Sequence, residues 1–337
     1  MRFRFFALMI GGFCPVVISA QVLRVDYSYD SSGFFTRHPA ARAALEQAAA
    51  DISRVLTGTF SGSPDNPIVG ERGRTRVEIS WESTINHPSK SDPTRVTTAG
   101  FTADTITVYA GAKPLVKKLG LGETGGISIS LKASGYGSGW AAAMAAAEKT
   151  FNAGMRADQG PILHTMTGSL AIGDTTTKYA LRYGVLTGSI SFNNDADGDG
   201  TADRDLSGLW HFDHTTAVAA GTNDFYSVAL HELLHVLGFG SGASWESRVD
   251  GNAWRGPMAS ARQGGGAGLI ALDRSHLTEG TMSTTLDGGR PQQAVMDPAL
   301  TVGTRNSLTA LDAAILSDLG YDVAGEAEPA SRPPASR

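Results

Sequence analysis

The hydrophobic pattern of the chain changes several times, and each change predicts an element. Residues 22–30 alternate apolar and polar side chains, which predicts a strand, whereas residues 41–56 place apolar side chains at helical spacing among strong helix formers. Other segments predict strands at 75–83, 104–111 and 188–193 and a helix at 141–154. The glycine-rich stretches around that helix, within 112–186, are expected to be loops.

Segment 222–240 has the most decisive pattern. Asp224 can cap the start of a helix, and leucine and valine side chains then give it apolar cover on more than one side. A helix that is apolar nearly all round belongs in the interior of a protein, and Gly238 is expected to end it. A further capped helix is predicted at 309–320, where Gly320 supplies the end.

These elements predict a single α+β domain. No internal repeat or linker divides residues 21–323, and residues 241–290, before the last helix, are rich in loop-forming types. The alanine- and proline-rich tail, 324–337, is expected to be disordered.

The first twenty residues are expected to be a secretory signal peptide. Arg2 and Arg4 precede an apolar stretch that ends in a small residue, Ala20, after which cleavage is expected. The only cysteine, Cys14, lies in this leader, so core burial must stabilise the mature chain without disulfides, and bound metal ions can add to it. We therefore expect secretion to the extracellular or periplasmic space, with no membrane attachment after cleavage.

Charge narrows the class of partner. The chain has 28 basic and 33 acidic residues, a formal net charge of −5, and loss of the two leader arginines takes it to −7. The basic residues are scattered, so no run of them indicates a nucleic-acid or membrane surface. None of these patterns sets an oligomeric state.

The predicted helix at 222–240 carries the motif H-E-x-x-H as HELLH. Histidines four residues apart share one helical face, so His231 and His235 can bind one Zn²⁺. Zinc lowers the pKa of a bound water from about 16 to about 7, and Glu232 can take the proton. The alternative, two ordinary polar histidines, would bury two imidazoles and a carboxylate in an apolar helix with no metal to offset their desolvation.

A catalytic zinc needs three protein ligands and one open position. Gly238 follows His235 by three residues, as in the pattern H-E-x-x-H-x-x-G-x-x-H, but the position of the third histidine holds Ser241. His276 is the one histidine further along the chain, and elimination favours it. The alternatives are two glutamates in loop-like sequence and two upstream histidines: Glu246, Glu279, His211 and His214.

An acidic segment, DADGDGTAD at 195–203, indicates a second metal site. Its acidic residues fall at positions 1, 3, 5 and 9 of a calcium loop of the EF-hand type: Asp195, Asp197, Asp199 and Asp203. Gly200 stands at the sharp turn, but Leu206 replaces the glutamate expected at position 12, and no helices clearly flank the loop. The match predicts a partial Ca²⁺ site, and the alternative is a solvated acidic turn.

Four segments together resemble a known family: DFYSVALHELLHVLGFG, DRSHLTEGTM, AVMDPAL and GTRNSLTALDAAILSDLGYDV. They are similar to secreted bacterial proteases of the metzincin type, especially the metalloproteases of bacteria with PEP-CTERM sorting tails, and more remotely to leishmanolysin. The resemblance spans roughly 24–323. In leishmanolysin-like enzymes an insertion separates the glycine from the third histidine, which supports His276. Met296 resembles the methionine of the Met-turn beneath the zinc ligands.

The resemblance implies a zinc metalloendopeptidase that hydrolyses protein or peptide substrates. It also implies a metzincin or zincin-like fold: a twisted, mostly parallel mixed sheet with an antiparallel edge strand, an active-site helix, and a smaller C-terminal subdomain that carries His276 and Met296. Two features depart from the family. The end AEPASRPPASR lacks the apolar span of a sorting tail, which favours free secretion, and no pro-segment with a cysteine switch is evident.

Two other classes of function stay open. One is a secreted binding or surface protein stabilised by zinc and calcium, and the other is a zinc hydrolase of non-peptide bonds. Glu232 favours an enzyme over a structural site, because structural sites usually fill the fourth position with cysteine or histidine and need no such carboxylate.

Overall fold

The computed structural model describes residues 22–60, 65–90, 95–98, 101–172 and 175–325. The expected leader, with Cys14, and the tail beyond residue 325 lie outside the described residues. Within the described ranges, no helix combines the length and the apolar character that a membrane crossing requires. Helices and several small mixed sheets alternate along this part of the chain, which confirms the α+β class.

The elements are numbered in chain order. The helices are α1 (Phe34–Arg37), α2 (Pro39–Val55), α3 (Trp140–Gly154), α4 (Phe225–Val236), α5 (Gly242–Glu246), α6 (Pro257–Arg262) and α7 (Ala310–Leu319). The strands are β1 (Leu23–Asp26), β2 (Ile68–Arg72), β3 (Thr75–Asn86), β4 (Arg95–Thr97), β5 (Ile106–Lys113), β6 (Gly120–Thr124), β7 (Gly126–Gly135), β8 (His164–Ile172), β9 (Thr175–Tyr183), β10 (Thr187–Asn193), β11 (Trp210–His211), β12 (Asn223–Asp224), β13 (Val249–Asp250), β14 (Ala253–Trp254), β15 (Met282–Thr284) and β16 (Pro291–Gln293).

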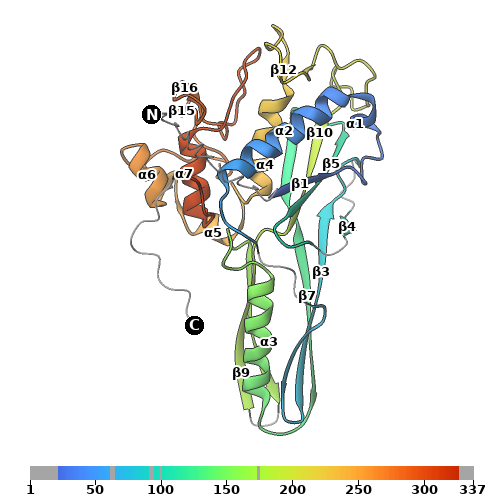
Figure 1. Ribbon diagram of the computed structural model, residues 1–337, viewed down its shortest axis with the longest axis vertical. Coiled ribbons are helices and arrows are strands. Elements are labelled where there is room, and N and C mark those ends of the chain that lie inside the picture. The colour runs from blue at the N-terminus through green and yellow to red at the C-terminus, as the bar shows by residue number, and fades with distance from the viewer. Residues whose placement is uncertain (1–21, 61–64, 91–94, 99–100, 173–174, 326–337) are drawn as a thin grey trace, which may run out of the picture.

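The sheet that positions the site has the order β1-β5-β10-β6. Strands β1, β5 and β10 are parallel, and β6 joins β10 antiparallel at the edge. All seven residues of β10 are buried, as expected of a parallel strand covered on both faces. Helices α2 and α4 pack against each other and against this sheet (Figure 1).

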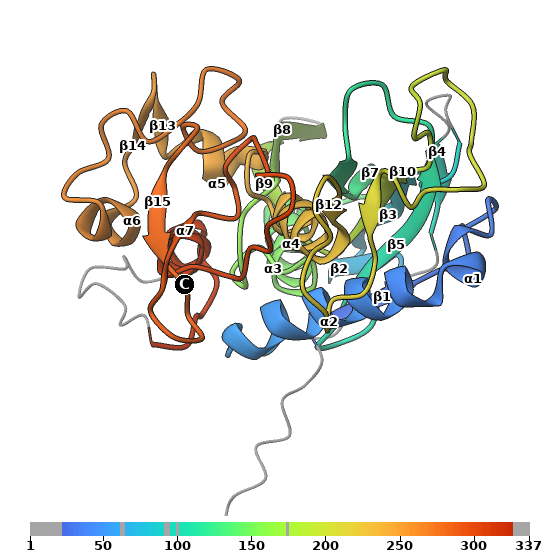
Figure 2. The same cartoon turned by 90° about the horizontal axis from the view of Figure 1, so that it is seen from above.

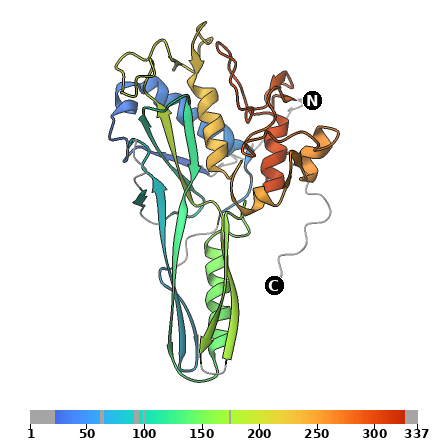
Figure 3. The same ribbon diagram turned by 180° about the vertical axis from the view of Figure 1, so that it is seen from behind.

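A second unit, here called the elongated lobe, comprises β2, β3, β4, β7, α3, β8 and β9. Strand β3 pairs with β2, β4 and β7, while β8 and β9 form a hairpin, and α3 lies between the two groups of strands (Figures 1 and 3). The lobe has its own hydrophobic cluster, which includes Trp140, Met144 and Phe151 of α3 together with Ile79 of β3. The chain passes from the main sheet into the lobe directly, from β6 to β7.

The strands around α3 correct the prediction that the glycine-rich stretches within 112–186 are loops. Strands β6, β7, β8 and β9 all lie there. In β6 the glycines mark close approach rather than turning, because a Cβ on Gly122 would lie 2.1 Å from the carbonyl oxygen of Glu232. The strand predicted at 22–30 is also shorter, since the Asp26 side chain accepts from Ser28 N at 2.8 Å and turns the chain.

The helix predicted within 222–240 is confirmed as α4, and its cap is confirmed too. Asp224 accepts from Ser227 N at 3.1 Å, and Arg305 pairs with the same buried carboxylate at 2.6 Å. Gly238 has φ +94°, a left-handed value that lets the chain turn directly after the helix. The last helix is confirmed as α7, with a capping box at Thr309 and an end at Gly320.

Residues 241–325 form a separate group of short elements around α7. In the view from above, this group lies on one side of α4 and the main sheet lies on the other (Figure 2). Asp318 of α7 accepts from Trp254 Nε1 at 2.9 Å and from Ala259 N at 3.0 Å, which ties α6 and β14 to the last helix. Helix α4 is therefore placed between two packed parts of the chain.

Candidate metal centre

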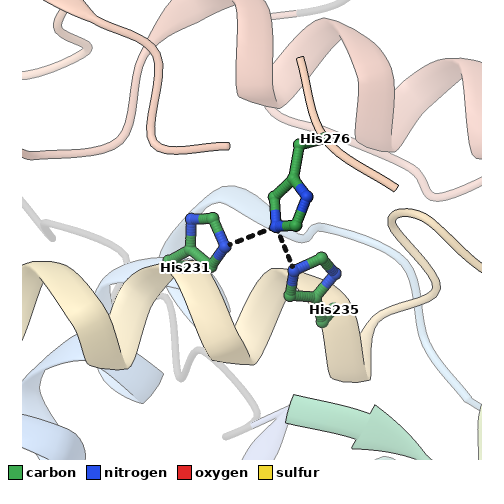
Figure 4. A group of neighbouring side chains, drawn as sticks. All are labelled: His231, His235 and His276. Atoms are coloured by element: carbon green, nitrogen blue, oxygen red, sulfur yellow. Dashed lines mark hydrogen bonds between the residues drawn. The ribbon is translucent and has the colours of Figure 1, made fainter. Parts of the chain in front are cut away.

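Three histidines converge in a cleft beside α4. His231 and His235 lie one turn apart on α4, and His276 comes from the loop between α6 and β15 (Figure 4). His276 Nε2 lies 3.2 Å from His231 Nε2 and 3.1 Å from His235 Nε2. The structure thus brings together the two motif histidines and the favoured third histidine.

The outer nitrogen of each ring is held by an oxygen. The three contacts are His231 Nδ1 to the Val295 carbonyl at 2.8 Å, His235 Nδ1 to the Phe239 carbonyl at 3.0 Å, and His276 Nδ1 to Asp273 Oδ2 at 2.6 Å. Because each oxygen is an acceptor, each Nδ1 must carry the proton. In the neutral ring the inward-facing Nε2 then presents a bare lone pair.

With all three rings neutral, three lone pairs this close repel one another unless a cation lies between them. Burial lowers the pKa of His231 well below its usual value and that of His235 to about 4, so both rings are neutral near pH 7. Zinc–nitrogen bonds of about 2.0–2.1 Å in a tetrahedron place the nitrogens roughly 3.3 Å apart. The observed separations of 3.1 and 3.2 Å match that geometry, so the donor set fits zinc.

Glu232 is buried beside the histidines and is held by the edge strand. Its Oε2 accepts from Gly122 N of β6 at 2.6 Å. Burial raises the pKa of Glu232 to about 7, while the Gly122 hydrogen bond opposes that rise by stabilising the charged form. A carboxyl group with a pKa of about 7 can both accept and release a proton near neutral pH.

The histidines and Glu232 line a cleft of about 960 Å³. Helix α4 contributes its face from Ser227 to His235. Strand β6 and residues 117–119 form one wall, and residues 295–300 with the loop around His276 form the other.

Met296 is fully buried at a junction between the ligands. Its carbonyl accepts from Leu277 N at 3.0 Å, next to His276, and the preceding residue Val295 holds His231. The backbone N–H groups of Val295 and Met296 donate to Asp312 of α7 at 3.1 and 3.4 Å. This turn thus connects two of the three histidines to the last helix.

The other candidates for a third ligand lie outside the histidine group in the part of the chain that is described. Glu246 pairs with Arg274 at 3.0 Å, and His211 Nε2 lies 2.8 Å from the Asp213 carbonyl. The His214 ring stacks on Tyr226, and Glu279 belongs to neither group of potential metal ligands among the described residues.

The acidic loop between β10 and β11 brings three of its four predicted ligands together. Carboxylate oxygens of Asp195, Asp197 and Asp203 lie within 4.8 Å of one another. Asp199 does not join them, because its carboxylate accepts from the Thr201 N–H at 2.7 Å and from the Thr201 hydroxyl at 2.6 Å. The predicted four-aspartate site is therefore a three-aspartate cluster in this structure.

Sequence reasoning missed the residues that hold the ligands in place. Asp273 lies three positions before His276, a spacing that signals a local contact once His276 is a candidate. Gly122 and the Val295 carbonyl carried no such signal, because they lie 110 and 64 residues from the side chains they hold. Comparisons with protein-family models, with curated proteins and with solved structures found no match for this chain.

Proposed function

We propose that this protein is a secreted zinc metalloendopeptidase of the metzincin type. One observation carries the proposal: three inward-facing imidazole nitrogens lie 3.1 and 3.2 Å apart, beside a buried carboxylate, in a cleft. A structural zinc site needs neither the carboxylate nor the cleft. The antiparallel edge strand beside α4 and the buried Met296 at the ligands support the metzincin assignment.

His231, His235 and His276 would hold the metal through Nε2. When bound, zinc supplies Lewis acidity, which polarises a substrate carbonyl and lowers the pKa of a coordinated water. Glu232 takes the proton from the attacking water and then donates it to the leaving amine. Gly122 orients the Glu232 carboxylate, and Asp273 holds the His276 ring with its Nε2 lone pair inward.

A direct test measures zinc content and casein cleavage on the mature chain, residues 21–337. We expect one zinc per chain and proteolysis from the wild type. Glu232→Ala should keep the zinc and lose activity by about 10²–10⁴-fold, the usual contribution of a general acid–base group. Glu246→Ala, which removes an exposed glutamate paired with Arg274, is the matched control and should change neither quantity.

Two outcomes would overturn the proposal. Full activity in Glu232→Ala would exclude the assigned proton transfer. A wild type that binds zinc but cleaves neither casein nor peptides would favour a binding protein or a hydrolase of non-peptide bonds.

A further inference from the structure

The acidic and basic side chains that line the cleft differ in the contacts that they make with the rest of the protein. Each cleft carboxylate already accepts hydrogen bonds from the protein: Glu232 from Gly122 N, Glu123 from Asn86 Nδ2 at 2.7 Å, Asp273 from His276 Nδ1, and Asp297 from Gly280 N and Ala299 N. Their capacity to bind a cationic substrate group is reduced accordingly.

The cleft cations have no such partners. Arg95, Lys117 and Lys118 line the cleft, and none of them forms an ion pair with a carboxylate of the described residues. The Arg95 guanidinium donates to Thr84 Oγ1 at 2.7 Å, a neutral acceptor. Among the described residues no carboxylate pairs directly with these three cations, which leaves them available to a carboxylate of a bound substrate.

Strand β6 and the residues that flank it give the approximate positions of Lys118 and Arg95 along the cleft. Gly122 is the residue that contacts Glu232, so it marks the position of the Glu232 carboxylate along the cleft. Lys118 lies four residues before Gly122, and Gly126 lies four residues after it. A Cβ on Gly126 would lie 2.6 Å from Arg95 Nη2, so Arg95 reaches that level. At about 3.3 Å per residue of extended chain, the two levels lie at most about 13 Å to either side of Glu232.

Arg95 also borders a second hollow, separate from the cleft. This hollow has a volume of about 580 Å³ and is also lined by Ile127, His164 and Tyr183. An extended peptide that runs from the metal centre to this hollow would therefore pass Arg95.

We propose that the site selects acidic peptide segments, in which substrate carboxylates on the two sides of the scissile bond pair with Lys118 and Arg95. This inference rests on the proposed peptidase function and names its substrate class. The spacing along β6 and its flanking residues places the preferred Asp or Glu within about four residues of the scissile bond on each side. Opposite charges at these positions increase the rate of encounter and fix the register of the bound peptide.

The test uses peptides that differ only in charge. Sites cleaved in casein supply a parent peptide, which is synthesised with Glu or with Gln at the fourth position on each side of the scissile bond. An exposed ion pair contributes a factor of about two to five, so kcat/KM should favour each Glu peptide by that factor. The preference should weaken at high salt, because ions screen exposed charges.

Variants assign the preference to each cation. Arg95→Gln should abolish the Glu-over-Gln ratio on one side of the bond, and Lys118→Gln on the other. Lys149→Gln, which removes an exposed lysine on α3 in the elongated lobe, is the control and should leave both ratios intact. Equal kcat/KM for the Glu and Gln peptides, or a ratio unchanged in both cleft variants, would overturn the inference.

Binding to zinc-loaded Glu232→Ala separates this inference from the function on which it rests. Fluorescein-labelled nonapeptides with random centres carry Glu or Gln at both ends, and their binding is followed by anisotropy. Tighter binding of the Glu series, lost in Glu232→Ala/Arg95→Gln, supports acidic selectivity even if the wild type cleaves no peptide. Equal binding of the two series contradicts it, whether or not the enzyme is a peptidase.

Discussion

The histidine centre and the acidic loop are both groups of potential metal ligands, but they are built differently. The three histidines come from α4 and from a loop more than 40 residues away, and the protein holds each ring by its second nitrogen. The acidic ligands lie within nine residues of one another, and Asp195 already accepts from Gly198 N at 2.7 Å and Gly200 N at 2.8 Å. A site assembled by the tertiary fold is preorganised, whereas a local turn can satisfy its carboxylates without a metal.

Removal of one potential ligand from each site should give the largest difference between the two sites. His276→Ala leaves two of three ligands, so zinc and proteolysis should both be lost. Asp203→Ala should retain both, because it changes only the acidic loop. Zinc content by plasma emission and casein cleavage measure the outcome. Zinc bound to His276→Ala with wild-type affinity would require another third ligand.

Asp273 tests whether the histidine centre depends on its supporting hydrogen bonds. Asp273→Asn removes the charge that holds the His276 Nδ1 proton at 2.6 Å, and loss of such a partner weakens metal binding by about 10–100-fold. Competition with a zinc chelator measures the affinity. Asp250→Asn, at an exposed aspartate paired with Arg255, is the control, and an equal effect there would exclude a specific role for Asp273.

Metal removal should affect stability unequally at the two sites. A ligand present at about 100 times its Kd stabilises the folded state by about 2.7 kcal/mol, and weaker binding gives less. A zinc chelator should therefore lower Tm by several degrees, and a calcium chelator by less. Asp195→Asn should abolish the calcium-dependent part of the Tm shift and leave the zinc-dependent part. A larger shift from calcium than from zinc would reverse the ranking of the two sites.

The smallest effect is expected inside the acidic loop. Asp199 is turned toward Thr201, so Asp199→Asn should change calcium affinity by less than about 0.5 kcal/mol, as is usual for a surface substitution. Asp197→Asn, within the cluster, should weaken binding more. Calorimetric titration with Ca²⁺ distinguishes the two. Equal losses of calcium affinity in both variants would mean that the Asp199 side chain turns to become a calcium ligand when the ion binds.

The correct predictions of the fold share one property, which is that neighbouring residues decide them. The cap at Asp224, the apolar cover of α4 and the glycine that ends α7 all act within a few residues, and each is confirmed. The wrong predictions concern β6 to β9. There the glycine content suggested turns. Gly120 and Gly122 instead leave room for α4, which packs against them although it is more than 100 residues away in the sequence.

The candidate metal centre likewise combines features that neighbouring residues decide with features that distant residues decide. The sequence by itself determined that His231 and His235 share one face of a helix, because four residues make about one turn whatever surrounds them. It also limited the third ligand to a few residues. Only the tertiary structure decided that His276 joins them, that Gly122 holds Glu232, and that Arg95 reaches the cleft. Those contacts join residues far apart in the chain, and they depend on how α4, β6 and the C-terminal segments pack together rather than on local spacing.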